Sequence, residues 1–161
     1  MANLHVSYAG LDLRNPLIVS SSGLTSSLER IRKLYNLGAG AIVLKSLFEE
    51  QIRFESGALS ESSDYPEALD YVRNYTRENS VAEYLNLIRE AKRAVHIPII
   101  ASINCVSAGE WIDFSKRIEE AGADAIELNV YFLPNNMEKP GHEYEKIYFD
   151  LLARVKSVIQ I

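Results

Sequence analysis

The sequence contains one cysteine, Cys105, and three histidines that stand far apart, at positions 5, 96 and 142. A single cysteine excludes an internal disulfide framework and a cysteine-rich zinc site, and scattered histidines predict no metal site. No apolar run is long enough to span a membrane, and the first residues, MANLHVSYAG, lack the features of a secretory signal. Acidic residues outnumber basic ones by 22 to 17, which argues against nucleic acid or an anionic membrane as a partner. We therefore expect a reduced, cytoplasmic, soluble protein.

What the chain does contain is a regular alternation of apolar runs and amphipathic segments. Its 161 residues are 47% hydrophobic, which is enough for one domain with a real core, so we expect a single domain over residues 1–161. The alternation in Leu4–Leu13 predicts a β-hairpin that turns at Ala9-Gly10. Buried strands are predicted at Leu17–Ser22, Ala41–Ser46, Pro98–Asn104 and Ala125–Val130. Helices are predicted from Ser26 or Ser27 to Gly38, from Ser80 to His96, at 109–120 and at 144–159.

Residues 47–79 interrupt this alternation. The stretch is polar and rich in charge, and a connection of such length is typically functional or disordered. We therefore expect an inserted loop region over 47–79, with Ser80 as the N-cap of the helix that follows.

A diverged repeat supports a parallel sheet. Gly38–Lys45 and Gly122–Asn129 both read G-A-x-A-I-x-L followed by a polar residue, and each predicts a helix end, a tight turn and a strand. Strict strand–helix alternation predicts an α/β fold with a parallel sheet and outer helices. A doubly wound sheet and a (β/α)8 (TIM) barrel both fit. The barrel usually needs about 250 residues, so about four of its eight units would be present here.

Each predicted strand is apolar along its length and polar at its carboxyl end. The ends carry Ser20–Gly23, Lys45-Ser46, Ser102, Asn104 and Asn129. In parallel α/β folds ligands bind at these ends, and hydroxyls, amides and a cation could hold a flat ring rich in heteroatoms. The alternative is that strand ends are polar simply because they lie near solvent. That alternative is weakest for Lys45, which directly follows an apolar run.

The sequence gives little indication of a classical nucleotide-binding motif or of a cysteine nucleophile. No G-x-G-x-x-G follows the first strand and no P-loop is present, which argues against a dinucleotide-binding or P-loop fold. Cys105 has no basic neighbour in the sequence, so we interpret it as an inert thiol.

Three segments in this order resemble the dihydroorotate dehydrogenase family: Asn15–Ile18 leading into Ser21–Gly23, Gly40–Ser46 and Gly122–Asn129. VLKSLFEEQI (43–52) and ELNVYFLP (127–134) are most similar to its dihydroorotate dehydrogenase-like branch. The resemblance covers essentially the whole chain but only the N-terminal half of the family's barrel. It implies an FMN-dependent enzyme of pyrimidine biosynthesis that transfers a hydride between substrate and flavin.

The resemblance also implies roles for individual residues. Ser21 and Ser22 would lie against the flavin, Lys45 would contact both flavin and substrate, and Ser46 would lie beside it. Asn104 and Asn129 match asparagines that contact flavin or substrate. The catalytic candidates are therefore Lys45 and Asn129, because a fixed cation near the ring stabilises the charge that reduction brings.

Two departures from the family pattern concern the substrate side. The family's loop after the fourth strand usually reads N-x-S-C-P-N, with Cys or Ser as the base, whereas Asn129–Asn135 reads NVYFLPN. The asparagine-rich substrate loop, N-x-x-G-x-x-N, is not recognisable in Tyr65–Asn79. We therefore expect poor oxidation of dihydroorotate itself.

Two other interpretations remain open. One is a non-catalytic half-barrel that self-associates; the other is a phosphate-sugar aldolase or isomerase with Lys45 as a Schiff-base or electrostatic lysine. Four open strands would leave two uncovered edges, so we expect a homo-oligomer or association with the missing half. The family holds the flavin phosphate with loops after strands seven and eight. The 161 residues alone are therefore expected to bind FMN weakly or not at all and to be inactive, while the complete protein acts on a small molecule.

Overall fold

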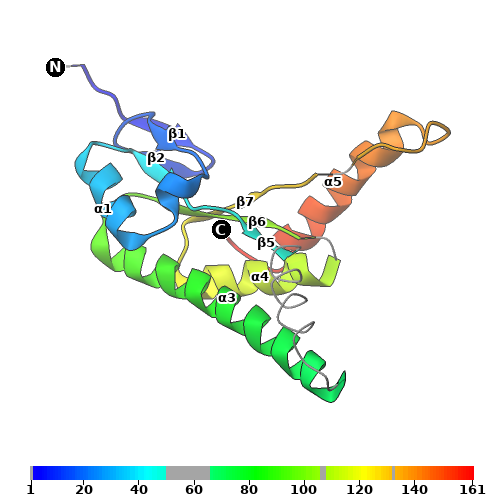
Figure 1. Cartoon of the computed structure of the whole chain (residues 1–161). Helices are drawn as coiled ribbons and strands as arrows, with labels where there is room; N and C mark the ends of the chain where they lie inside the picture. Colours follow the sequence, from blue (N-terminus) through cyan, green and yellow to red (C-terminus); the bar gives the residue numbers. More distant parts are fainter. Residues whose placement is uncertain (1, 50–65, 106–107, 132) are drawn as a thin grey trace.

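The computed structural model describes residues 2–49, 66–105, 108–131 and 133–161, and shows a five-stranded sheet covered by helices, with a separate two-stranded hairpin (Figure 1). The five-stranded sheet is parallel throughout, with β6 at its centre, β4 and β5 along one side of β6 and β7 along the other. Its strands are β3 (Ile18–Val19), β4 (Ala41–Val43), β5 (Leu47–Phe48), β6 (Ile99–Asn104) and β7 (Ala125–Leu128). The predicted α/β class with parallel β/α units is confirmed.

The helices pack mainly on one face of this sheet. They are η1 (Gly23–Thr25), α1 (Leu28–Asn36), α3 (Pro66–Ala94), α4 (Ala108–Ala121) and α5 (Gly141–Lys156). Figure 1 shows α3 and α4 side by side along this face, while α5 projects away from the sheet. Alternate residues of β4 and β6, including Ile42, Ile99 and Ile103, are fully buried in the main core with Ile88 of α3. Each such side chain contributes about 1.5–3 kcal/mol of burial free energy. No helix in the described ranges is both long and apolar enough to cross a membrane.

The N-terminal hairpin covers the other face at its amino end. β1 (Val6–Tyr8) and β2 (Leu11–Leu13) pair antiparallel around Ala9 and Gly10, whose φ angles are 49° and 79°. Two consecutive positive φ values define the tight hairpin turn that the sequence predicted. Leu13 packs with Ala41 and Ile100 in a second, smaller core near the strands' amino ends. The hairpin therefore closes that end and leaves the carboxyl ends open.

The second predicted helix begins earlier than expected. It starts at Pro66 and runs through Ser80, so Ser80 is not an N-cap. Proline is common at the first helical position, where its fixed φ suits the helix and no N–H is needed. Residues 50–65 of the predicted 47–79 loop lie outside the described residues. At its two ends the prediction was wrong, because Leu47-Phe48 form β5 and 66–79 are helical.

The two repeat units share their turn and then diverge. Gly38 and Gly122 both end a helix in the left-handed region, with φ of 100° and 93°. Two residues later the first unit has Gly40, where a Cβ atom would lie 2.2 Å from the carbonyl oxygen of Asn15. The second unit has Asp124 there, which accepts hydrogen bonds from the backbone N–H of Ile99 and from Lys92. The shared glycine thus reflects the shared turn, and the later difference reflects different neighbours.

Candidate functional site

The strand that carries Lys45 and Ser46 is interrupted by a bulge. β4 pairs with β6 through Val43 opposite Ile100, and β5 pairs with it again through Leu47 opposite Ile103. The segment from Val43 to Leu47 therefore has one residue more than the segment it faces. Such a bulge redirects side chains, and bulges often occur next to active sites. Here Ser46 is buried and Lys45 is exposed. The predicted single strand Ala41–Ser46 is therefore corrected to two short strands around this bulge.

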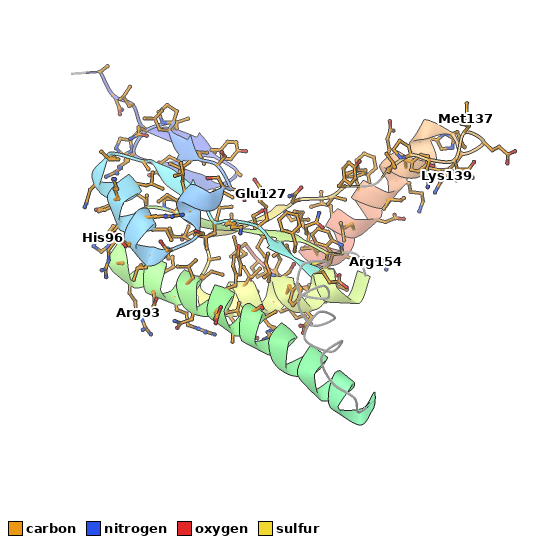
Figure 2. All side chains as sticks on the ribbon, viewed as in Figure 1. Arg93, His96, Glu127, Met137, Lys139 and Arg154 are labelled. Carbon is orange, nitrogen blue, oxygen red and sulfur yellow. The ribbon has the colours of Figure 1, made fainter. Side chains whose placement is uncertain are left out.

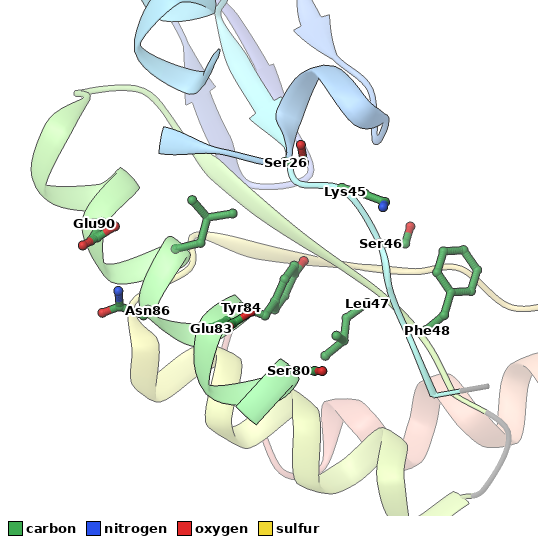
Figure 3. Close-up of a pocket in the computed structure, with 11 residues that line it drawn as sticks. Ser26, Lys45, Ser46, Leu47, Phe48, Ser80, Glu83, Tyr84, Asn86 and Glu90 are labelled. Carbon is green, nitrogen blue, oxygen red and sulfur yellow. The ribbon is translucent and has the colours of Figure 1, made fainter. Parts of the chain in front are cut away.

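Tyr84 of α3 fills the gap that the bulge leaves in the backbone ladder. Its hydroxyl donates to the carbonyl oxygen of Ser102 (3.0 Å) and accepts from the Ser102 backbone N–H (2.9 Å). These two Ser102 groups face the bulged strand, since the carbonyl of Ile100, two residues earlier, bonds to Leu44 N–H. Burial, and secondarily the charge of Glu127, raise the pKa of the Tyr84 phenol, while its backbone bond to Ser102 lowers it. Figure 3 shows the phenol reaching from α3 toward the segment with Lys45 and Ser46.

Four side chains form a hydrogen-bonded chain across the sheet. Ser21 Oγ lies 3.0 Å from Ser46 Oγ, which lies 2.7 Å from Ser102 Oγ. Ser102 Oγ donates to Glu127 Oε1 at 2.6 Å. The four residues stand at or near the carboxyl ends of β3, the bulged strand, β6 and β7. Figure 2 shows Glu127 on the face of the sheet away from α3 and α4. This polar chain therefore crosses the open face.

A cavity of about 580 Å³ lies over this end of the sheet. It is lined by Ser21, Ser22, Gly23, Lys45, Ser46, Phe48, Glu127, Leu128, Asn129 and Val130. Its volume falls in the range of about 300–1,000 Å³ that is typical of small-molecule sites. Lys45 also borders a second cavity of about 490 Å³, which lies between the bulged strand and α3 and is shown in Figure 3. The bulge thus places one cation at the border of both cavities.

Most of the predicted site residues meet at the first cavity. Ser21, Ser22, Lys45, Ser46 and Asn129 line it, as the convergence of parallel strand ends predicts. The Ser22 side chain also accepts from Leu24 N–H and so caps η1.

Asn104 is not among the residues that line this cavity. Its side-chain amide donates to the carbonyl oxygen of Asn129 at 2.6 Å. Asn104 therefore supports the strand end that carries Asn129.

Two members of the site, Glu127 and Tyr84, were not among the residues predicted from the sequence. Glu127 is an acid inside the apolar run AIEL, where an unpartnered charge is costly, and that mismatch was the available indication. Tyr84 fits the apolar periodicity of α3, so the sequence gave no sign of its hydrogen bonds. Within the described residues, no group of three or more His, Cys, Asp or Glu side chains is placed to hold a metal ion.

The fold is a parallel β/α structure with a cavity at the carboxyl ends of its strands. In sequence, the chain is 34% identical over 131 residues to the catalytic subunit of dihydroorotate dehydrogenase B (NAD(+)) of Thermoplasma volcanium. That alignment covers 81% of this chain and 42% of the relative. The corresponding subunit of Methanothermobacter thermautotrophicus is 30% identical over an alignment of 173 positions, gaps included, which covers 98% of this chain and 51% of the relative.

A more distant relative carries a different name. The NAD-dependent dihydropyrimidine dehydrogenase subunit PreA of Escherichia coli is 24% identical over 138 residues, with 79% of this chain and 32% of the relative covered. No family model matches the chain. The chain spans about half or less of the length of these curated relatives. The chain is therefore similar in sequence to dihydroorotate dehydrogenases, as its motifs indicated, and its parallel β/α units align with about half of those relatives.

Proposed function

We propose that the complete protein is an FMN-dependent oxidoreductase that dehydrogenates a reduced pyrimidine ring. In this proposal the present chain supplies the surface on which the flavin ring and the substrate lie. The observation that carries it is the meeting of Lys45 and Asn129 in one cavity at the carboxyl ends of parallel strands, in a relative of dihydroorotate dehydrogenases.

The chemistry of the cavity fits a flavin ring. Such a ring carries carbonyl oxygens and ring nitrogens, and Lys45 and the Asn129 amide offer donors while Ser21 and Asn129 offer acceptors. Lys45 Nζ has no hydrogen bond or ion pair to the described residues, so it can meet a ligand without first breaking a contact. Phe48 and Leu128 add apolar surface. The residues therefore offer both polar ends and an apolar wall.

When bound, the flavin would accept the hydride that leaves the substrate. The chain's own residues do the rest. The Lys45 ammonium supplies positive charge at the ring edge, and preorganised charge of this kind is worth more in a site that excludes water than in bulk solvent. The Asn104 amide fixes the Asn129 carbonyl and thereby orients the backbone that presents the Asn129 side chain. The bulge holds Lys45 outward, so the fold sets its position.

The substrate that fits best is a reduced pyrimidine without a carboxylate. Tyr131 and Leu133 stand in the stretch where the family has its Cys or Ser base, and both are exposed (73% and 65%). Neither supplies a thiol or an aliphatic hydroxyl at that position, and the asparagines with which the family would bind the substrate carboxylate are not recognisable in Tyr65–Asn79. The relative named a dihydropyrimidine dehydrogenase supports ring dehydrogenation beyond dihydroorotate.

The test is anaerobic mixing of the complete protein, purified with its flavin, with a dihydropyrimidine and separately with dihydroorotate. We expect the flavin absorbance to bleach faster with the ring that lacks a carboxylate. A colourless protein that takes up no FMN would contradict the flavin assignment, and faster bleaching with dihydroorotate would contradict the substrate assignment.

A self-associating half-barrel is the second candidate, because α5 exposes apolar surface. Phe149 and Leu152 are 68% and 48% exposed although they lie in an amphipathic helix. In this alternative the exposed face of α5 packs against another copy or against the rest of the barrel. Sedimentation velocity and flavin content together separate the two candidates, since only the first requires bound flavin.

A further inference from the structure

The hydrogen bonds between Ser21, Ser46, Ser102 and Glu127 have one possible direction when Glu127 is ionised. An ionised carboxylate only accepts, so the single proton of Ser102 Oγ goes to Glu127. Ser102 Oγ must then accept from Ser46, and Ser46 Oγ must accept from Ser21. Three hydroxyls therefore donate in sequence toward one carboxylate, and bonds arranged in this way polarise one another. We call these four residues the hydroxyl relay.

The Ser21 end of the hydroxyl relay can only accept from a ligand. Its proton is directed to Ser46 Oγ, and one lone pair already accepts from the Ser46 backbone N–H at 3.0 Å. The remaining lone pair of Ser21 Oγ is available to a ligand, because Ser21 lines the cavity. Ser102 in the middle is fully buried, whereas Glu127 at the far end is exposed. The relay thus runs from a half-buried acceptor, through the sheet surface, to a carboxylate at solvent.

We propose that the hydroxyl relay is the proton acceptor of the site, with Glu127 as its terminal base. The proposal rests on the proposed function and supplies the base that residues 131–133 lack. The proton that leaves the substrate ring passes to Ser21 Oγ as the Ser21 proton moves to Ser46, that of Ser46 to Ser102 and that of Ser102 to Glu127. The ring keeps the electron pair of the broken bond, and Glu127 later releases its proton to water.

In this scheme Ser21 meets the substrate, and Glu127 is a positioning residue that acts through Ser102 and Ser46. Two other groups face Glu127 in the described structure. Lys45, on the bulged strand, lines the same cavity, and Tyr84 of α3 interacts with Glu127 electrostatically. Tyr84 holds the Ser102 backbone from the helix side and fixes the middle of the relay.

A double-mutant cycle tests the relay without any substrate. Ser21 and Glu127 have no direct hydrogen bond, so Ser21→Ala and Glu127→Gln should be additive in urea unfolding unless the hydroxyls couple them. We expect the double variant to lose less stability than the sum of the two single losses. Ser115→Ala is the matched control, because the hydroxyl of this buried serine donates to the Trp111 carbonyl within α4, and the substitution should be additive with Glu127→Gln. Additivity for Ser21 as well would overturn the relay.

Kinetics of the complete, flavin-loaded protein give the second readout. Glu127→Gln keeps an acceptor oxygen for Ser102 but loses basicity, so we expect flavin reduction by the dihydropyrimidine to slow by about a hundredfold or more. The rate of flavin reduction should fall toward acid pH in the wild type and should not do so in the Gln variant. In mixtures of H2O and D2O, a plot of the wild-type rate against the deuterium fraction should be curved, because several protons move in the relay. FMN affinity should not change. An unchanged rate and pH profile in Glu127→Gln would overturn the proposal.

Failure of the proposed function is a separate result. If the wild-type protein binds flavin but is not reduced, the reaction assignment fails, and the double-mutant cycle still decides whether the four residues are coupled. If the cycle is non-additive and Glu127→Gln reduces flavin normally, the relay exists but is not the proton acceptor, and the proposal is overturned.

Discussion

Tyr84 and Ser102 are joined by two hydrogen bonds through one phenolic oxygen, which donates to the Ser102 carbonyl and accepts from the Ser102 N–H. In a regular parallel sheet these backbone groups would bond to the neighbouring strand, and the bulge at residues 44–46 removes that partner. The helix thus completes the sheet at the point where the site begins. Both residues are buried, so water cannot take the place of the phenol.

Tyr84→Phe should therefore destabilise the fold. The substitution keeps the ring but leaves the buried Ser102 N–H and carbonyl without their partner, at about 1–3 kcal/mol for each unsatisfied group. Urea unfolding should show the loss as a lower midpoint with an unchanged slope. Tyr35→Phe is the control, because Tyr35 is half-buried and interacts through its ring and backbone with Arg14. Equal stability of the two variants would contradict the role given to the Tyr84 hydroxyl.

The same phenol predicts a pH dependence of stability. Burial raises the pKa of Tyr84 above its ordinary value of about 10, so the folded state keeps the proton that the unfolded state gives up. Its contribution is complete below about pH 10 and is lost as the pH rises further. Unfolding free energies measured from about pH 8 to about pH 11 should fall more steeply for the wild type than for Tyr84→Phe. Parallel curves would show that the phenol is not held protonated.

Gly40→Ala should be strongly destabilising, because the new Cβ would lie 2.2 Å from a backbone oxygen of Asn15 that cannot easily move. We expect a loss of about 1–3 kcal/mol, as in other overpacked sites, measured by thermal or urea unfolding. Gly109→Ala is the matched control: no atom lies within 4 Å of its new Cβ, and it sits inside α4, where alanine is favoured over glycine. Gly109→Ala should be neutral or stabilising, and a similar loss in both variants would contradict the packing assigned to Gly40.

The exposed apolar face of α5 predicts that the 161-residue chain self-associates. Phe149 and Leu152 present large side chains to solvent, and such surface is typical of interaction sites. Sedimentation velocity should show a concentration-dependent oligomer, and Phe149→Glu should shift it toward monomer. Lys146→Glu, also exposed on α5, is the control for added negative charge. A wild-type chain that stays monomeric at high concentration would exclude self-association.

The sequence predicted the strands and the convergence of Lys45, Ser46 and Asn129 because both follow from local pattern. Apolar runs with polar ends identify buried parallel strands, and parallel strands bring their carboxyl ends to one edge. The repeat also predicted the shared turn, since Gly38 and Gly122 both adopt a conformation that glycine favours.

The features that were not predicted depend on tertiary contacts, which no local sequence pattern specifies. LKSLF suits a continuous strand as well as a bulged one, and only the register against β6 shows the extra residue. Ser80 has the chemistry of an N-cap, but α3 begins at Pro66, a residue that favours the first helical position, and Ser80 lies in its interior. The role of Glu127 could not be predicted, because it depends on hydrogen bonds that connect it to three serines distant in the sequence.

FMN titration of the complete apoprotein measures whether Lys45 on the bulge is the cation of a flavin site. Wild type, Lys45→Ala, Lys45→Arg and Lys116→Ala should be compared, Lys116 being an exposed lysine of α4. A hydrogen bond to a charged group is worth about 1.5–3 kcal/mol, which is roughly a tenfold to hundredfold change in Kd. We expect that loss for Lys45→Ala, partial retention for Lys45→Arg and wild-type affinity for Lys116→Ala. Wild-type affinity and an unchanged rate of flavin reduction in Lys45→Ala would contradict this role of Lys45.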